Sequence, residues 1–149
     1  MDDAESLRFL LVDGHSVIHA WPELRALHRD APRRHLAREQ LMHQLRLIRD
    51  MLGEQVVVVF DGSQSKTTEE REPDGLQIFY ADRATTADTI LERLAARYAS
   101  LHPMRVVSAD GMVRETIHAL GAEWMSPERL LDLVNEAGQR LRQQMRPGR

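Results

Sequence analysis

The sequence contains no cysteine, which excludes disulfide bonds, thiolate nucleophiles and every metal site built from cysteine ligands. Any metal chemistry must therefore use oxygen or imidazole ligands. No stretch approaches the roughly 18 consecutive apolar residues of a membrane-spanning helix. The acidic start, Met1-Asp2-Asp3, also lacks the features of a secretory leader. We therefore expect a cytoplasmic protein with no membrane partner.

Lysine is almost absent: Lys66 is the single lysine among 20 basic side chains. The net charge of -3 lacks the positive balance that is typical of nucleic-acid-binding proteins. The arginines are nevertheless concentrated, because seven of them lie between Arg25 and Arg49. This segment is either a solvated helix surface or a phosphate-binding surface, and the sequence leaves both interpretations open.

The apolar segments predict an α/β fold in a chain that has the length of one domain. Residues 7–12 and 56–60 are nearly continuous apolar runs, which is typical of parallel strands buried on both faces. Between them, apolar residues at helical spacing lead to Gly53, which is placed as a helix cap. Further strands are expected at 76–80, 105–108 and 123–125, and further helices from Thr86, from Met112 and from Ser126.

This alternation predicts a three-layer α/β/α sandwich with a mainly parallel, Rossmann-like sheet. We expect an N-terminal extension at residues 1–6, one domain at 7–142 and a basic tail at 143–149. The polar segment 62–75 is expected to be a loop.

Three expected strands lead into aspartates, namely Asp13, Asp61 and Asp110. Since the carboxyl ends of parallel strands share one edge of a sheet, these carboxylates should converge there. Asp88 lies in the first turn of the next helix, and Glu92 follows it one turn later on the same face. Converging carboxylates repel one another unless protons or a divalent cation neutralise them, and oxygen ligands suit Mg²⁺ or Mn²⁺.

Each aspartate taken alone also has a purely structural interpretation. Asp13-Gly14 and Asp61-Gly62 are common turn dipeptides, Asp88 can complete a capping box with Thr85, and Asp110 can cap a helix. The four acids together, at one predicted edge, favour a metal-binding active site.

Four segments resemble a known family in the right order. Residues 10–18 (LLVDGHSVI), followed by Ala-Trp-Pro at 20–22, resemble the opening of the YacP-like branch of the NYN domains, which are PIN-like nucleases. Residues 57–62 (VVVFDG) are similar to the family's second strand and acid. Residues 86–92 (TADTILE) are similar to its acidic helix start, and 107–110 (VSAD) to a later strand end. The resemblance extends from about Leu7 into the closing helix.

The resemblance implies a PIN-like fold and divalent-metal-dependent hydrolysis of RNA, in RNA decay or processing. It assigns Asp13, Asp61, Asp88 and Asp110 to the acidic site. His15 and Ser16 stand where the family pattern has Tyr and Asn, and Ala109 separates Ser108 from Asp110. Ser16 retains a hydroxyl that can support Asp13, and Glu92 is either a fifth site acid or an exposed helix charge.

Other residues carry weaker signals for substrate binding. Arg33, Arg34 and Arg38, and Lys66 and Arg71 in the expected loop, are candidates for contacts with RNA phosphates. Trp21 either stacks a base or anchors packing beside Pro22. His15 and His19 can share a helical face, but no third ligand nearby supports zinc.

The leading hypothesis is a metal-dependent endoribonuclease that acts on single-stranded RNA, with a ribonucleoprotein as a possible partner. The alternative is a catalytically weak PIN-like module that binds RNA or a ribonucleoprotein, which His15 and Ser16 motivate. A phosphatase is less well supported, because the haloacid dehalogenase pattern needs a second aspartate where His15 stands.

Overall fold

The buried apolar runs of the sequence form a six-stranded sheet in a computed structural model, which describes residues 7–62, 67–72 and 76–145. The sheet order is β3-β4-β2-β1-β5-β6. All neighbouring strands are parallel except β3 and β4. The strands are β1 (Phe9–Asp13), β2 (Gln55–Asp61), β3 (Thr68–Arg71), β4 (Gln77–Ala81), β5 (Met104–Val107) and β6 (Glu123–Met125).

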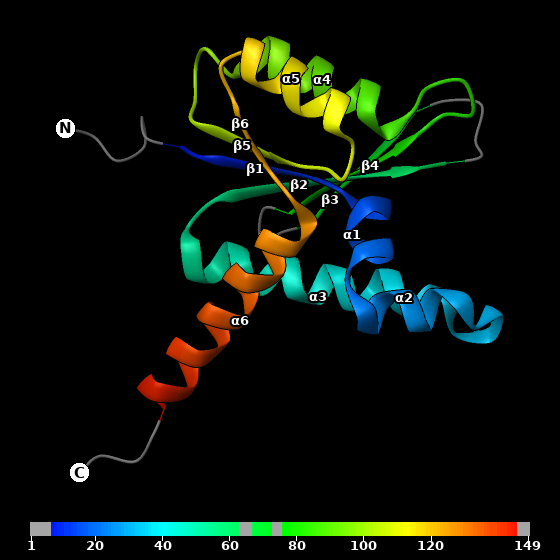
Figure 1. Cartoon of the computed structure of the whole chain (residues 1–149), viewed down its shortest axis with the longest axis vertical. Helices are drawn as coiled ribbons and strands as arrows, with labels where there is room; N and C mark the ends of the chain where they lie inside the picture. Colours follow the sequence, from blue (N-terminus) through cyan, green and yellow to red (C-terminus); the bar gives the residue numbers. More distant parts are fainter. Residues whose placement is uncertain (1–6, 63–66, 73–75, 146–149) are drawn as a thin grey trace.

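Helices cover both faces of this sheet, which confirms the predicted three-layer α/β/α sandwich (Figure 1). One face carries α1 (Gly14–Ala20), α2 (Pro22–Arg29), α3 (Arg34–Leu52) and α6 (Pro127–Gln144). The other face carries α4 (Ala87–Tyr98) and α5 (Gly111–Ala119). The central strands are buried on both sides because alternate residues of β1 and β2 belong to two separate hydrophobic clusters.

The predicted helix ends agree with the structure where the sequence carries a strong local signal. Gly53 ends α3 in the left-handed conformation, with φ of 70°. Ser126 caps α6 by accepting a hydrogen bond from the Arg129 backbone N–H, and Pro127 occupies the first turn.

Two parts of the fold differ from the expectation. The segment 62–75 is not simply a loop, because Thr68–Arg71 forms β3 and pairs antiparallel with β4. All four side chains of β3 are exposed, so this strand carries no apolar pattern that would predict it. The structure also has two helices, α1 and α2, and a short 3-10 turn, η2 (Ala31–Arg33), between β1 and α3.

Trp21 anchors the junction between α1 and α2. Its side chain is buried, and its Nε1–H donates a 2.8 Å hydrogen bond to the carbonyl oxygen of Pro127 at the start of α6. This position confirms the packing interpretation of Trp21 and excludes it as an exposed platform for a base. Gly14, at the start of α1, is required by close packing, since a Cβ there would lie 2.3 Å from the Phe60 ring.

The described residues contain no helix that is long and apolar enough to cross a membrane.

Candidate active site

The carboxyl edge of the sheet carries the first two predicted acids. Asp13 ends β1, and Asp61 ends the neighbouring strand β2, two residues beyond the position that pairs with Asp13. Asp13 is buried, with only 7% of its surface exposed, whereas Asp61 is exposed. The Asp13 carboxylate accepts a 3.2 Å hydrogen bond from the Ser16 backbone N–H, and so caps α1 as well.

Asp88 joins the acids of β1 and α5. It lies in the first turn of α4, where its carboxyl group interacts by charge and by hydrogen bonding with both Asp13 and Asp110. Asp110 caps α5 by accepting a 2.9 Å hydrogen bond from the Met112 backbone N–H. The structure therefore brings Asp13, Asp88 and Asp110 together, although they come from three separate segments.

The environment of Asp88 raises its pKa from 3.8 to about 7. Partial burial is the largest cause, followed by the negative charge of Asp13 and the hydrogen bonds with Asp13 and Asp110. Asp88 therefore holds a proton near neutral pH when no cation is present. The proton relieves the repulsion that three ionised carboxylates would otherwise exert on one another.

Asp61 reaches the same helix start by a different contact. Its Oδ1 accepts a 2.8 Å hydrogen bond from the backbone N–H of Ala87, the residue directly before Asp88. Thr86, and not Asp88, provides the side-chain cap of α4, because its hydroxyl accepts a hydrogen bond from the Thr89 N–H. The capping-box interpretation of Asp88 is therefore wrong, and its carboxyl group is directed to the other acids.

Two serines fix the loop that carries Asp110. The Ser16 hydroxyl accepts a 3.2 Å hydrogen bond from the Ala109 N–H, and the buried Ser108 hydroxyl accepts one of 3.1 Å from the Asp110 N–H. Ser16 thus connects α1 to the loop between β5 and α5. The sequence singled out Ser16 but gave Ser108 no role, although its place at the end of a buried strand was a usable signal.

The acids fit a divalent cation in donor chemistry. They supply oxygen ligands only, and the proton on Asp88 marks a site with excess negative charge that a cation would neutralise. Within residues 7–62, 67–72 and 76–145, no group of three or more His, Asp or Glu side chains is already placed to hold a metal ion. The acids would therefore need to adjust around a cation.

The remaining predicted residues lie at varied distances from this edge. Glu92 is half-buried one turn after Asp88, and the hydrogen bonds that join the acids do not include it. Arg71 pairs in register with Gln77, at the amino end of β4, and its guanidinium contacts Glu69 at 2.7 Å, so the structure does not bring it to the acids. Lys66 lies outside the described residues.

Arg38 is the predicted arginine with the clearest link to the site edge. Its guanidinium carbon lies 4.6 Å from the ring centre of Phe60, which directly precedes Asp61, and 5.3 Å from that of Tyr80. Arg33 and Arg34 are exposed around the start of α3, where Arg33 contacts Asp30 at 3.5 Å. The contact of Arg38 with Phe60 and Tyr80 was not predicted from the sequence, because the two rings come together only through the pairing of β2 with β4.

A mainly parallel sheet with carboxylates gathered at its carboxyl edge is the arrangement of a PIN-like α/β domain. Residues 10–149 match the model of the YacP-like NYN domain, and the chain belongs to that family. It is 28% identical over 139 residues to the uncharacterized protein YacP of Bacillus subtilis, a match that covers 92% of this chain and 81% of YacP.

Solved structures agree with this assignment. The crystal structure of Rae1 (YacP) from Bacillus subtilis aligns with a TM-score of 0.75 and 27% identity over 97% of this chain and 79% of Rae1. The structure of its W164L mutant gives a TM-score of 0.77 and 27% identity over 91% of this chain and 79% of that one.

Proposed function

We propose that this protein is a metal-dependent endoribonuclease that hydrolyses phosphodiester bonds in RNA. The observation that carries the proposal is the meeting of Asp88 with Asp13 and Asp110, with Asp61 bound to the backbone beside Asp88. The capping bonds of Asp13 and Asp110 do not account for the carboxyl group of Asp88, which lies against both of them at a cost in charge repulsion. The family membership points to the same activity class.

Asp13, Asp61, Asp88 and Asp110 would hold Mg²⁺ or Mn²⁺. The cation would supply the Lewis acidity that activates water and offsets charge on the phosphodiester. The chain itself contributes the positioning of the acids: the Ser16 N–H orients Asp13, the Ala87 N–H orients Asp61, and the Met112 N–H orients Asp110. Asp88 must lose its proton to act as a ligand, so binding of the cation should release a proton and should tighten as the pH increases toward about 7.

The proposed substrate is single-stranded RNA, in a decay or processing role, either free or within a ribonucleoprotein. The exposed arginines around the start of α3 support an anionic substrate. Metal-carboxylate chemistry does not itself require a 2′-hydroxyl, so the preference for RNA would come from contacts outside the acids.

A second candidate function is a catalytically weak module that binds RNA or a ribonucleoprotein. The motivating observation is the pair His15 and Ser16, where the family pattern has Tyr and Asn. Ser16 uses its hydroxyl to hold the Ala109 N–H and has no side-chain amide to offer a substrate or a water.

Cleavage of labelled single-stranded RNA with Mn²⁺, with and without chelator, tests the proposal. We expect cleavage that chelator abolishes and that Asp88→Asn lowers on the order of 100-fold or more. Asp132→Asn removes an exposed carboxylate of α6 and serves as the control with parental activity. Binding without cleavage by the parent would favour the second function. Equal cleavage of DNA of the same sequence would refute the preference for RNA.

A further inference from the structure

A row of aromatic and basic side chains leads away from the acidic site across α1 and α2. His15 follows Asp13-Gly14, and its ring lies edge-on to Phe60 with 5.9 Å between the centres. The His19 ring stacks near His15 at 6.4 Å, and the His28 ring meets His19 edge-on at 5.0 Å. We call His15, His19 and His28 the histidine row.

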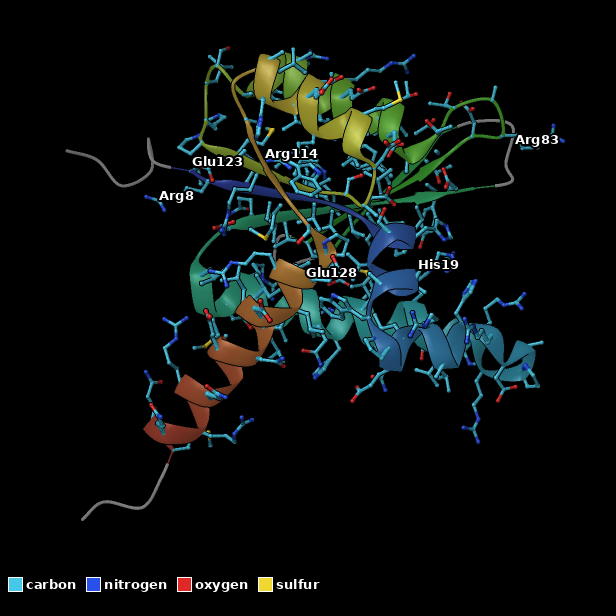
Figure 2. The ribbon with its side chains drawn as sticks, in the orientation of Figure 1. Arg8, His19, Arg83, Arg114, Glu123 and Glu128 are labelled. Atoms are coloured by element: carbon cyan, nitrogen blue, oxygen red, sulfur yellow. The ribbon has the colours of Figure 1, made fainter. Side chains whose placement is uncertain are left out.

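The helix geometry explains why three residues so far apart form one row. His15 and His19 are four residues apart on α1, so they lie on one face of that helix. The chain then turns at Trp21 and Pro22, and α2 brings His28 back beside His19. Figure 2 shows His19 projecting from α1, on the other side of the view from Arg8, which precedes β1.

Two permanent charges flank the histidine row. Arg38 covers Phe60 and Tyr80 at the end nearer the acids. At the other end, the Arg34 Nε–H donates a 2.8 Å hydrogen bond to the carbonyl oxygen of His28. Both arginines and His19 are exposed, whereas His15 and His28 are half-buried, so cationic groups and an imidazole ring are open to solvent in the same region. Single-stranded RNA uses these two kinds of contact, since phosphates pair with cations and bases stack on rings.

The charges around His28 disfavour its protonation in the free protein. Partial desolvation, and then the charges of His19, Arg34 and His15, lower the pKa of His28 below its ordinary value of 6.5. The groups that act on it come from α1 and from the start of α3, and all of them are cationic when charged. An anion placed among them would reverse this effect, because it attracts the proton that the cations repel.

We propose that His19 and His28, with Arg34 and Arg38, form a track for single-stranded RNA beside the acidic site, and that RNA binding there is coupled to proton uptake at His28. The inference rests on the proposed RNA substrate, but it concerns binding and does not require cleavage. Affinity should therefore increase as the pH falls, by about tenfold from about pH 7.5 to about pH 5.5.

The test measures binding of labelled single-stranded RNA in chelator, with Asp88→Asn as the background. This background prevents cleavage and removes the titration of Asp88, which would also tighten binding at low pH. In it, His19→Gln with His28→Gln should lose most of the increase at low pH. His43→Gln with His118→Gln removes two exposed histidines outside the row and should keep the increase.

A gain-of-charge pair keeps the test decisive if the glutamine variant folds poorly. His19→Arg with His28→Arg fixes the positive charge and should bind RNA at about pH 7.5 as tightly as the background protein binds at about pH 5.5. Calorimetry in two buffers of different ionisation enthalpy should detect proton uptake on binding, and the arginine variant should show less of it.

The inference would be overturned if the double glutamine variant and the double arginine variant of His19 and His28 both kept the pH dependence of the background protein. This holds even if the protein cuts RNA. Coupled binding without any cleavage by the parent protein in Mn²⁺ would leave the inference standing and refute the proposed endoribonuclease.

Discussion

Asp88 keeps its proton in the folded protein over a pH range in which the unfolded chain has already lost it. Its carboxyl group lies beside Asp13 and Asp110, and its pKa is about 7 instead of 3.8. Between these two values the folded protein binds one more proton than the unfolded chain does. Stability should therefore decrease as the pH rises from about 4 to about 7, and the loss should remain above that range.

Asp88→Asn should remove this loss, because asparagine has no charge to repel Asp13 and Asp110. At about pH 8 in chelator we expect the variant to be more stable than the parent by roughly 1–2 kcal/mol, a figure that allows for solvent screening of a half-buried group. At about pH 4 the two should be nearly equal. Urea unfolding at both pH values measures the difference.

Asp132→Asn provides the matched control, since this exposed residue of α6 should give the same small change at both pH values. A loss of stability for Asp88→Asn that is equal at both pH values would show that Asp88 acts only as a structural residue.

The placement of α1 and α2 depends on a contact between distant elements. Trp21 lies between these helices, and its indole N–H reaches the Pro127 carbonyl at the start of α6. This carbonyl belongs to the first turn of α6, whose backbone accepts hydrogen bonds from residues further along the helix. The contact thus ties the junction of α1, which carries Ser16, His15 and His19, and α2, which carries His28, to the C-terminal helix.

Trp21→Phe should destabilise the protein by about 1–2 kcal/mol, because it removes a buried hydrogen bond and leaves a smaller ring in the same space. Thermal melting measures the cost. Trp124→Phe is the control, since Trp124 is only half-buried and its indole N–H has no hydrogen-bond partner among the described residues. Equal losses for the two variants would contradict a specific role of the bond to Pro127.

The sequence predicted those elements whose signals are local and strong. The unbroken apolar runs of β1 and β2 and the left-handed Gly53 cap predicted the strand-helix-strand core, and the aspartates at strand ends predicted the acidic edge. By contrast, α1 and α2 are short and amphipathic, and the only strong local signal for their boundary was Pro22 in a first helical turn. The contact between His19 and His28 depends on that turn, so the spacing of the histidines alone did not predict it.

The finer arrangement of the acids also needed the three-dimensional structure. The sequence grouped Asp61 with the other three, but it did not predict that Asp61 binds the Ala87 backbone while Asp88 interacts with Asp13 and Asp110. These contacts depend on how α4 is rotated above the sheet edge. Sequence periodicity identifies the buried face of a helix but does not fix the direction of each first-turn side chain.

The molecule as a whole is slightly acidic, with a net charge of -3, so the proposed RNA binding would depend on where its positive charge lies. Replacing Arg33, Arg34 and Arg38 by Gln should weaken RNA binding and make it less sensitive to salt, because fewer counterions would be released. We expect the slope of log K against log salt to fall by roughly 0.7 for each RNA phosphate that an arginine no longer neutralises.

Titrations of RNA binding at several salt concentrations measure this slope. Arg93, Arg97 and Arg114 are exposed on α4 and α5, which cover the opposite face of the sheet, so their triple Gln variant should keep the parental slope. If both triple variants lower the slope equally, the positive charge acts as a general field, and the arginines around α3 form no specific surface.

The two outer strands of the sheet bear on how this protein behaves at high concentration. An edge strand exposes unpaired backbone groups to which another chain can add, and β-sheet proteins avoid this with charged or very short edge strands. Here one outer strand, β3, is Thr-Glu-Glu-Arg with all four residues exposed, and the other, β6, has only three residues. The apolar central strands, which would aggregate readily if they lay at an edge, are thus shielded by strands that are poor templates. This arrangement disfavours edge-to-edge association into extended β-structure.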